Sequence, residues 1–376
     1  MRFGQETLLN LSENVHCSMK KVAIIGTQGV PAKYGGFETL VENMIGENAS
    51  SEVEYTVYCS SKDMPQILSE YKGVKLKYIP LRANGIQSIP YDIVSIFSAA
   101  KDSDVLLILG VSGCLCLPLF RLFHKKRLVI NIDGLEHRRA KWGKLARWVL
   151  KKSESMAIKY ADVIISDNKG IQDYVKETYS MDSEMIAYGG DHVLRGLTDQ
   201  QQSEILARIG VQASDYCFTV CRIEPENNCH MILEAFAQTG QKLMFVGNWM
   251  RSEYGKQLKE KYSTYSNIMI SDPIYDIDVL YALRKNCRCY MHGHSAGGTN
   301  PSLVEAMFFG VPIVAYDVVY NRESTGNKAL YFTDVQQLNS ILVSAEVTTS
   351  VGEAMLDYAQ ENYRWSKIAK QYESLY

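Results

Sequence analysis

Short apolar runs alternate with amphipathic stretches along almost the whole chain of 376 residues. The amphipathic stretches, such as GFETLVENMIGE and PSLVEAMFFG, repeat apolar residues at the spacing of one helix face. The apolar runs are short and rich in β-branched residues, and they predict strands near residues 21–26, 54–59, 74–79, 104–109, 127–132, 162–166, 216–221, 242–247, 268–271, 288–292 and 312–316. Strands that alternate with helices in this way predict an α/β fold with parallel sheets.

A polar stretch over residues 197–215 separates two series of strands of similar size. At about 150 residues per domain, the chain length also favours two domains. We therefore expect two facing Rossmann-like domains, divided as a disordered leader over 1–19, a first domain over 20–195, a second domain over 196–357 and a C-terminal helix over 358–376 that packs back toward the first domain. Because ligands of such sheets bind beyond the carboxyl ends of the strands, the chemistry should lie in the loops that follow strands.

Composition narrows the class of protein. A net charge of −2 gives no reason to expect a nucleic-acid partner. Nine cysteines without a C-x-x-C pair indicate reduced thiols and a cytoplasmic protein, and His292-x-His294 lacks further ligands at metal spacing, so no metal is expected. The longest apolar run, residues 105–120, is shorter than the ~20 residues that span a bilayer, so we expect no transmembrane segment.

The segment HGHSAGGTNPSLVEAMFFGVPIVAY, residues 292–316, has the pattern of a strand, a glycine pair, Thr299 or Asn300 as N-cap, and a helix that starts with Pro301. Backbone N–H groups preceded by glycines suit a diphosphate, and a carboxylate one turn further can accept hydrogen bonds from sugar or ribose hydroxyls. The alternative is a well-capped helix with an exposed glutamate, which leaves the glycine pair unexplained. The candidates for substrate binding here are His294, Gly297, Gly298, Thr299, Asn300 and Glu305.

A second candidate segment is FTVCRIEPENNCHMILEAF, residues 218–236, in which a predicted strand delivers Arg222 to the loop that follows it. An arginine at this place can bind a phosphate with two parallel hydrogen bonds. A surface ion pair with Glu224 or Glu226 is an equally good interpretation of this segment taken alone.

A third candidate segment begins where a predicted strand ends in Asp133, followed by Glu136 and His137. Side chains at this place can act as acids or bases, or bind substrate hydroxyls. The chain then becomes basic over 138–152 and contains Trp142 and Trp148. Such a helix can lie on an anionic membrane surface or meet a lipid phosphate, or it can be a solvated helix with its tryptophans packed inward.

The loop GTQGVPAKYGGFETLVENM, residues 26–44, follows the first strand but lacks the G-x-G-x-x-G of a dinucleotide site. Gly35 and Gly36 allow backbone N–H groups to approach a ligand at the start of a helix. Glu38 in the first helical turn suits the helix dipole, and contact with an acceptor is its alternative role.

Together these motifs resemble the retaining glycosyltransferases of family 4, whose GT-B architecture consists of two facing Rossmann-like domains. The resemblance covers nearly the whole chain from about Lys20. The motifs GTQGVPAKYGGFETLVE, NIDGLEHRR, CRIEPENN and HGHSAGGTNPSLVEAM, in this order, are similar to a branch of rhamnosyltransferases that build bacterial capsule and cell-wall polysaccharides. The resemblance implies transfer of L-rhamnose from dTDP-L-rhamnose to a lipid-linked saccharide at the cytoplasmic face of the membrane, without a metal or other cofactor.

The resemblance also assigns roles to individual residues. Glu305 matches the second carboxylate of the family's E-x7-E pattern and is expected to hold the donor's ribose, whereas the first carboxylate position is Gly297. Arg222 matches the arginine of an R-x4-K diphosphate clamp, whereas the lysine position is Asn227. Asp133, Glu136, His137 and Arg222 are then the residues expected at the reaction.

Three alternatives follow from the same residues. A transferase that uses a UDP-hexose would have the same fold. The departures at positions 297 and 227 also fit a nucleotide-sugar-binding protein without transferase activity. A nicotinamide-dependent oxidoreductase is disfavoured because no G-x-G-x-x-G follows any predicted strand.

Overall fold

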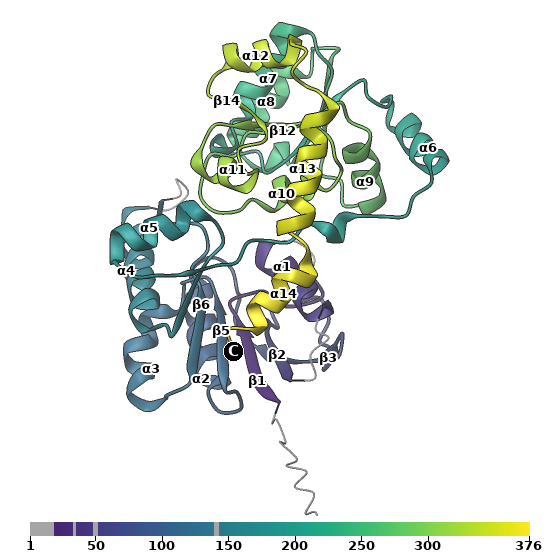
Figure 1. Ribbon diagram of the computed structural model, residues 1–376. Coiled ribbons are helices and arrows are strands. Elements are labelled where there is room, and N and C mark those ends of the chain that lie inside the picture. The colour runs from purple at the N-terminus through teal and green to yellow at the C-terminus, as the bar shows by residue number, and fades with distance from the viewer. Residues whose placement is uncertain (1–18, 33–34, 48–51, 139–142) are drawn as a thin grey trace, which may run out of the picture.

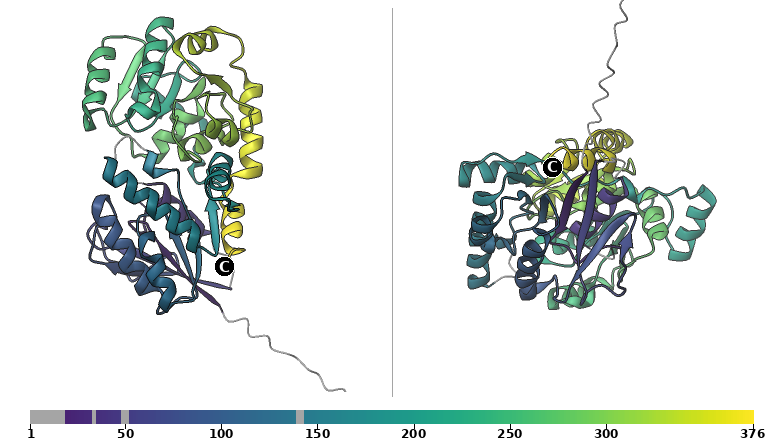
Figure 2. Two further views of the ribbon diagram at one scale, coloured as in Figure 1. Left: turned by 90° about the vertical axis from the view of Figure 1, so that its left-hand side faces the viewer. Right: turned by 90° about the horizontal axis from the view of Figure 1, so that it is seen from below.

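The computed structural model describes residues 19–32, 35–47, 52–138 and 143–376, and it consists of two α/β domains, one above the other in Figure 1. The left view of Figure 2 shows the two domains one above the other from the side, and the right view shows the molecule from below. Residues 1–18 of the predicted leader, together with Arg139, Lys141 and Trp142 of the basic segment, lie outside the described residues.

The first domain contains an eight-stranded sheet in the order β3-β4-β2-β1-β5-β6-β7-β8. Its neighbouring strands are parallel except for β3 and β4, which form an antiparallel pair. Register places Asn131 on β6 opposite Ile165 on β7, so the loops after these two strands emerge side by side. The strands are β1 (Lys20–Ile25), β2 (Val53–Ser60), β3 (Glu70–Tyr71), β4 (Val74–Ile79), β5 (Val105–Leu109), β6 (Arg127–Asn131), β7 (Val163–Ser166) and β8 (Glu184–Met185).

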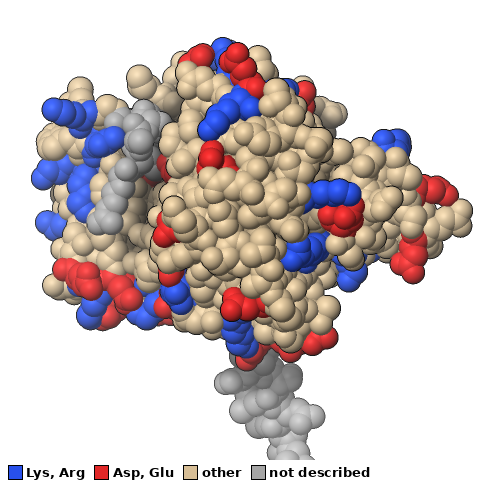
Figure 3. Space-filling view, turned by 90° about the horizontal axis from the view of Figure 1, so that it is seen from above, with Lys and Arg blue, Asp and Glu red and all other residues tan. Residues whose placement is uncertain are grey.

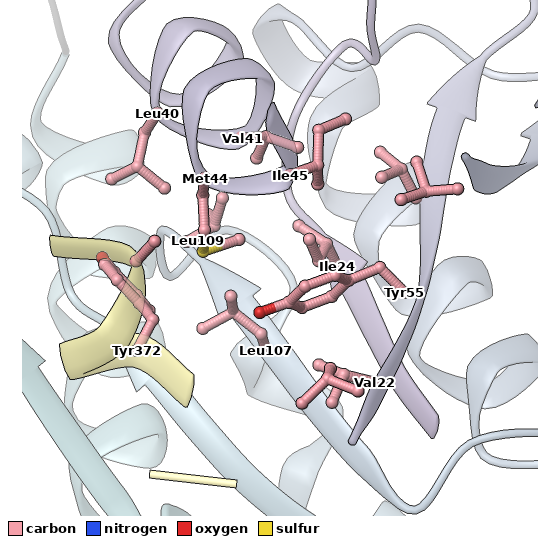
Figure 4. Close-up of a cluster of buried hydrophobic side chains, with 14 of the residues drawn as sticks. Val22, Ile24, Leu40, Val41, Met44, Ile45, Tyr55, Leu107, Leu109 and Tyr372 are labelled. Carbon is pink, nitrogen blue, oxygen red and sulfur yellow. The ribbon is translucent and has the colours of Figure 1, made fainter. Parts of the chain in front are cut away.

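Helices cover both faces of this sheet and bury an apolar core on each. In Figure 4 the side chains of Leu40, Val41, Met44 and Ile45 on one helix point at Ile24 and its neighbours on the sheet. Their spacing of three and four residues is what places them on one helix face. The helices are α1 (Gly36–Gly46), α2 (Ser88–Ala99), α3 (Leu117–Phe123), α4 (Lys144–Tyr160) and α5 (Lys169–Tyr179).

The second domain contains a six-stranded parallel sheet in the order β11-β10-β9-β12-β13-β14. Its strands are β9 (Cys217–Val220), β10 (Leu243–Val246), β11 (Ile268–Ser271), β12 (Cys289–His292), β13 (Ile313–Tyr316) and β14 (Leu330–Phe332). Its helices are α7 (Cys229–Thr239), α8 (Glu253–Tyr262), α9 (Ile277–Lys285), α10 (Pro301–Met307), α11 (Val319–Ser324), α12 (Val335–Val343) and α13 (Thr349–Asn362). The chain reaches this sheet through α6 (Asp199–Ile209), and the predicted boundary near residue 195 lies just before that helix.

The end of the chain crosses back to the first domain. The sequence predicts one continuous helix here, but the structure has two, α13 and α14 (Trp365–Glu373). The break is at Tyr363, whose carbonyl accepts a hydrogen bond of 2.8 Å from Gly190 N, while Tyr372 on α14 accepts one of 2.8 Å from Asn131. A straight helix could not pack on both domains, so α14 turns onto the first domain beside α1 (Figure 1).

Two general features bear on the predictions from composition. The eight cysteines among the described residues are free thiols. Within the described ranges, every helix is too short or too polar to cross a bilayer.

Candidate active site

The two domains touch through loops that follow strands. Gly134, after β6, lies so close to Gly297 that a Cβ on Gly134 would come within 3.1 Å of the Gly297 carbonyl. Gly297 and Gly298 have φ of +27° and +73°, a region that L side chains rarely adopt. The predicted glycine pair is therefore required by both backbone conformation and the close approach of the first domain.

Asp167 is the side chain that joins these loops. It follows β7, and its Oδ2 accepts a hydrogen bond of 3.0 Å from Thr299 N, while the Thr299 hydroxyl donates to the Asp167 carbonyl. Burial, and then the nearby Asp133, raise the pKa of Asp167 to about 7. Thr299, predicted to bind substrate, is thus bonded to the first domain in this structure.

The two candidate loops of the second domain are tied to each other. The Asn227 side chain donates a hydrogen bond of 2.6 Å to the Arg222 carbonyl, and its Oδ1 lies 2.5 Å from Nδ1 of His294. Both side chains are buried, so they shape the site from behind rather than line it. Burial, and then His294, lower the pKa of His292 to about 3, which keeps that imidazole neutral.

Arg222 emerges between these loops with a side chain that is 32% exposed. Its guanidinium lies 3.8 Å from Glu224 on one side and 3.8 Å from Glu226 on the other. The surface ion pairs that the sequence left open are therefore present, but at this distance they are too long for bidentate hydrogen bonds. The guanidinium keeps the donors with which an arginine can bind a phosphate.

Glu305 lies on α10 and is held by Arg284 and His192, which come from other elements. Its Oε2 accepts a hydrogen bond of 2.6 Å from Arg284 on α9, and its Oε1 lies 3.5 Å from Nε2 of His192. Trp365 donates to Nδ1 of His192, so the neutral ring carries its proton on Nε2, facing the carboxylate. Burial alone would raise the pKa of Glu305, but Arg284 and His192 hold it below its usual value. Glu305 is therefore an ionised acceptor of fixed position.

The start of α10 confirms the predicted capping pattern. Asn300 is the N-cap and accepts hydrogen bonds from Ser302 N at 3.0 Å and from the Ser302 hydroxyl at 2.8 Å, with Pro301 as the first helical residue. The Asn300 side chain is thus used by the helix, which is the alternative that the sequence offered for this residue.

The first loop approaches the second domain where α1 begins. A Cβ on Gly36 would lie 3.9 Å from Pro301, and Gly35 has a φ of +134°. Glu38 accepts hydrogen bonds from the Thr27 hydroxyl at 3.1 Å and from Gln28 N at 2.8 Å. Its carboxylate therefore fastens the loop to α1, while the two glycines bring that loop to the interface.

His137 faces the first domain's own core rather than the second domain. It lies in a short 3-10 turn, η3 (Glu136–Arg138), and its Nδ1 is 2.8 Å from Oε2 of Glu154 on α4. Burial would raise the pKa of Glu154, but His137, Tyr179 and Tyr174 lower it to about 2. The His137–Glu154 contact anchors the loop that carries Asp133 and Glu136, so His137 acts on the site through the loop's position.

The basic segment is only partly free to meet a partner. Lys151 is 3.1 Å from Glu154 and lies over the rings of Tyr174 and Tyr179, so it belongs to the same buried cluster. Trp148 is 60% exposed, and the alternative that packs both tryptophans inward is wrong for this one. Figure 3 shows Lys and Arg side chains gathered at the left edge of the molecule, the side on which α4 lies in Figure 1.

Family models match both halves of the chain. Residues 203–337 match "Glycosyl transferases group 1". The second domain is a group 1 glycosyltransferase domain. Residues 19–191 match "Domain of unknown function (DUF1972)". None of the curated proteins is a significant match to the sequence.

Solved structures with the same two-domain fold match almost the whole chain. Sucrose-phosphate synthase from Thermosynechococcus elongatus is 15% identical with a TM-score of 0.79, over 95% of this chain and 98% of that one. Anabaena HepE in complex with UDP-glucose is 15% identical with a TM-score of 0.72, over 95% and 99%. Starch synthase IV from Arabidopsis thaliana, bound to ADP and acarbose, is 12% identical with a TM-score of 0.69, over 95% and 98%. The fold is GT-B, and its second domain is a group 1 glycosyltransferase domain.

The sequence analysis missed Asp167, Arg284 and His192. Asp167 could have been found, because it follows a predicted strand and such loops were expected to carry the chemistry. Arg284 and His192 carry no such signal, since their contact with Glu305 depends on how α9 and the linker pack against α10.

Proposed function

We propose that this glycosyltransferase moves a sugar from a nucleoside-diphosphate donor onto a lipid-linked saccharide, with retention of configuration and without a metal or other cofactor. L-rhamnose from dTDP-L-rhamnose is the proposed donor, and bacterial capsule or cell-wall polysaccharide the proposed product. The observation that carries the proposal is the meeting of strand-end loops from both domains at Gly134, Asp167 and Gly297 in a chain with a group 1 glycosyltransferase domain.

In this proposal the second domain holds the nucleotide. Arg222 and the backbone N–H groups of Gly297 and Gly298 stabilise the charge that grows on the leaving diphosphate, an electrostatic role that often dominates such reactions. Glu305, ionised and fixed by Arg284, accepts hydrogen bonds from the ribose hydroxyls. Asp133 and Glu136 face the acceptor from the first domain, and the leaving phosphate takes the acceptor's proton.

The donor is the first thing to test. We expect one of dTDP-rhamnose, UDP-glucose, UDP-galactose and GDP-mannose to raise the melting temperature of the protein, because a ligand that binds only the folded state stabilises it. The same donor should be consumed when a lipid-linked acceptor is added. Stabilisation by UDP-glucose or UDP-galactose alone favours the UDP-hexose alternative. Binding without turnover with any acceptor would leave the non-catalytic binding protein as the better description.

Contact with the membrane surface is proposed through α3 and α4, which pack against each other. Exposed apolar side chains project from both helices, at 54–76% exposure, and Lys144 and Lys152 lie exposed among them. Apolar and basic side chains on one surface suit an anionic bilayer, where the acceptor's lipid would be held. The apolar residues are Leu119, Leu122, Phe123, Leu145 and Trp148.

We expect the double variant Leu145→Glu/Trp148→Glu to bind vesicles containing phosphatidylglycerol at least tenfold more weakly than the wild type. It removes two side chains whose burial is worth about 2 kcal/mol each and adds charges that the lipid repels. Sedimentation with vesicles measures the binding. The matched control is Met250→Glu/Ile277→Glu, which replaces two similarly exposed apolar residues on the second domain. If both double variants bind the vesicles equally well, α4 is a solvated helix that does not contact the membrane.

A further inference from the structure

Asp167 has a carboxylate oxygen that the fold does not use. Its Oδ2 accepts from Thr299 N, but its Oδ1 is sealed from solvent and has no hydrogen-bond partner among the described residues. Leaving a buried polar atom unpaired typically costs about 1–3 kcal/mol. A buried carboxylate oxygen of this kind at the contact between two domains points to a group that arrives with a ligand.

The surroundings of Asp167 define what that group can be. Asp133 follows the neighbouring strand, and its charge acts on Asp167. Gly298 packs directly against this carboxylate, since a Cβ there would come within 2.7 Å of Oδ2 and 3.0 Å of Oδ1. A phosphate oxygen has no proton to donate to Oδ1, so the diphosphate itself cannot pair with this atom. The described residues hold no cluster of three or more acidic, His or Cys side chains that would suit a metal ion.

We propose that Asp167 binds the transferred sugar, with Oδ1 accepting a hydrogen bond from a sugar hydroxyl while Oδ2 holds Thr299 and thereby the Gly297–Gly298 loop. A hydroxyl is the neutral donor that a sugar brings to this place. The nucleotide part of the donor lies on the second domain, so Asp167 contacts only the sugar part. This inference rests on the proposed transferase function.

The test compares a sugar nucleotide with its nucleoside diphosphate. The probe is whichever of the four donors named above stabilises the wild type, for example UDP-glucose against UDP. Asp167→Asn should bind the sugar nucleotide about ten- to a hundredfold more weakly, because a hydrogen bond to a charged group is lost, and should bind the nucleoside diphosphate within twofold of the wild type. Isothermal titration at about pH 8 measures both affinities.

The control is Asn168→Ser on the adjacent residue. The Asn168 side chain donates hydrogen bonds of 3.2 Å to the Tyr320 carbonyl and of 3.2 Å to the Ser324 hydroxyl. It also caps the N-terminus of α5, and a serine can keep this role. This variant loosens the same domain contact without touching the carboxylate, so it should not discriminate between the two ligands. Equal weakening of both ligands by Asp167→Asn, or no weakening, would overturn the inference. A wild type that binds none of the sugar nucleotides would instead refute the proposed function.

If Asp167→Asn fails to fold, the pH dependence of sugar-nucleotide affinity in the wild type tests the same inference. The groups that interact with Asp167 are Asp133 and Thr299 N, and the charge of Asp167 also acts on the phenols of Tyr363 and Tyr372. A hydroxyl that donates to the carboxylate favours its ionised form, and the pKa of the free enzyme's Asp167 is about 7. Affinity for the sugar nucleotide should therefore rise from about pH 6 to 8 and then level off. An affinity that does not change over this range would contradict the inference.

Discussion

The Glu305→Ala variant is expected to lower the free energy of unfolding of the second domain by about 3–5 kcal/mol, because it leaves the buried Arg284 without its counter-ion. Arg284 is only 6% exposed, and its guanidinium lies 2.6 Å from the Glu305 carboxylate. The midpoint of thermal unfolding measures the loss. The contribution is present above the ordinary glutamate pKa and disappears as pH falls through the lowered pKa of Glu305, so the two proteins should converge in acid.

A second variant separates this structural role from the proposed contact with ribose. Arg284→Met/Glu305→Leu removes both charges, and replacing a buried ion pair by apolar residues of similar size is often close to neutral. We expect the double variant to recover most of the melting temperature and to bind the donor no better than Glu305→Ala. Recovery of both stability and donor affinity would show that Glu305 serves only the fold.

The regular part of the fold follows from the spacing of apolar residues. All eleven predicted strands are present, because each is long enough to show an apolar run with a turn at its end. The strands that were missed, β3, β8 and β14, are two or three residues long and show no period. The break between α13 and α14 was also missed. Its cause is the crossing between two domains, which no local pattern of residues records.

The site was predictable where backbone chemistry decides it, as at Gly297, Gly298 and the Asn300 cap. The site was not predictable where a residue far away in the sequence determines how a side chain is oriented. His137 sits on the predicted loop, yet Glu154 turns it toward α4. The sequence has Gly297 at the position where the resemblance to family 4 implies a carboxylate, and the structure brings Asp167 of the other domain next to this loop. Contacts between domains join residues more than 100 positions apart, which motif spacing does not reach.

The Arg222→Ala variant is expected to lower kcat/KM by about a hundredfold, with little change in stability. Removing one group that stabilises charge in the transition state typically costs about 10²–10³ in rate. The ion pairs lost with the side chain are 3.8 Å long and part-exposed, and such pairs contribute at most about 1 kcal/mol to folding. Asn227 bonds to the Arg222 carbonyl, so the loop keeps its shape in the variant. Steady-state kinetics with the donor identified by thermal shift measure the effect.

The affinity for the nucleoside diphosphate decides what Arg222 does. If the guanidinium binds the diphosphate, Arg222→Ala should also weaken that ligand about tenfold. Arg251→Ala, which removes an exposed cation from the same domain, is the control for net charge and should leave both measurements unchanged. A hundredfold loss of turnover with unaltered nucleoside-diphosphate affinity would remove Arg222 from the diphosphate site of the ground state. The loosely held guanidinium would then act on charge that appears only as the glycosidic bond breaks.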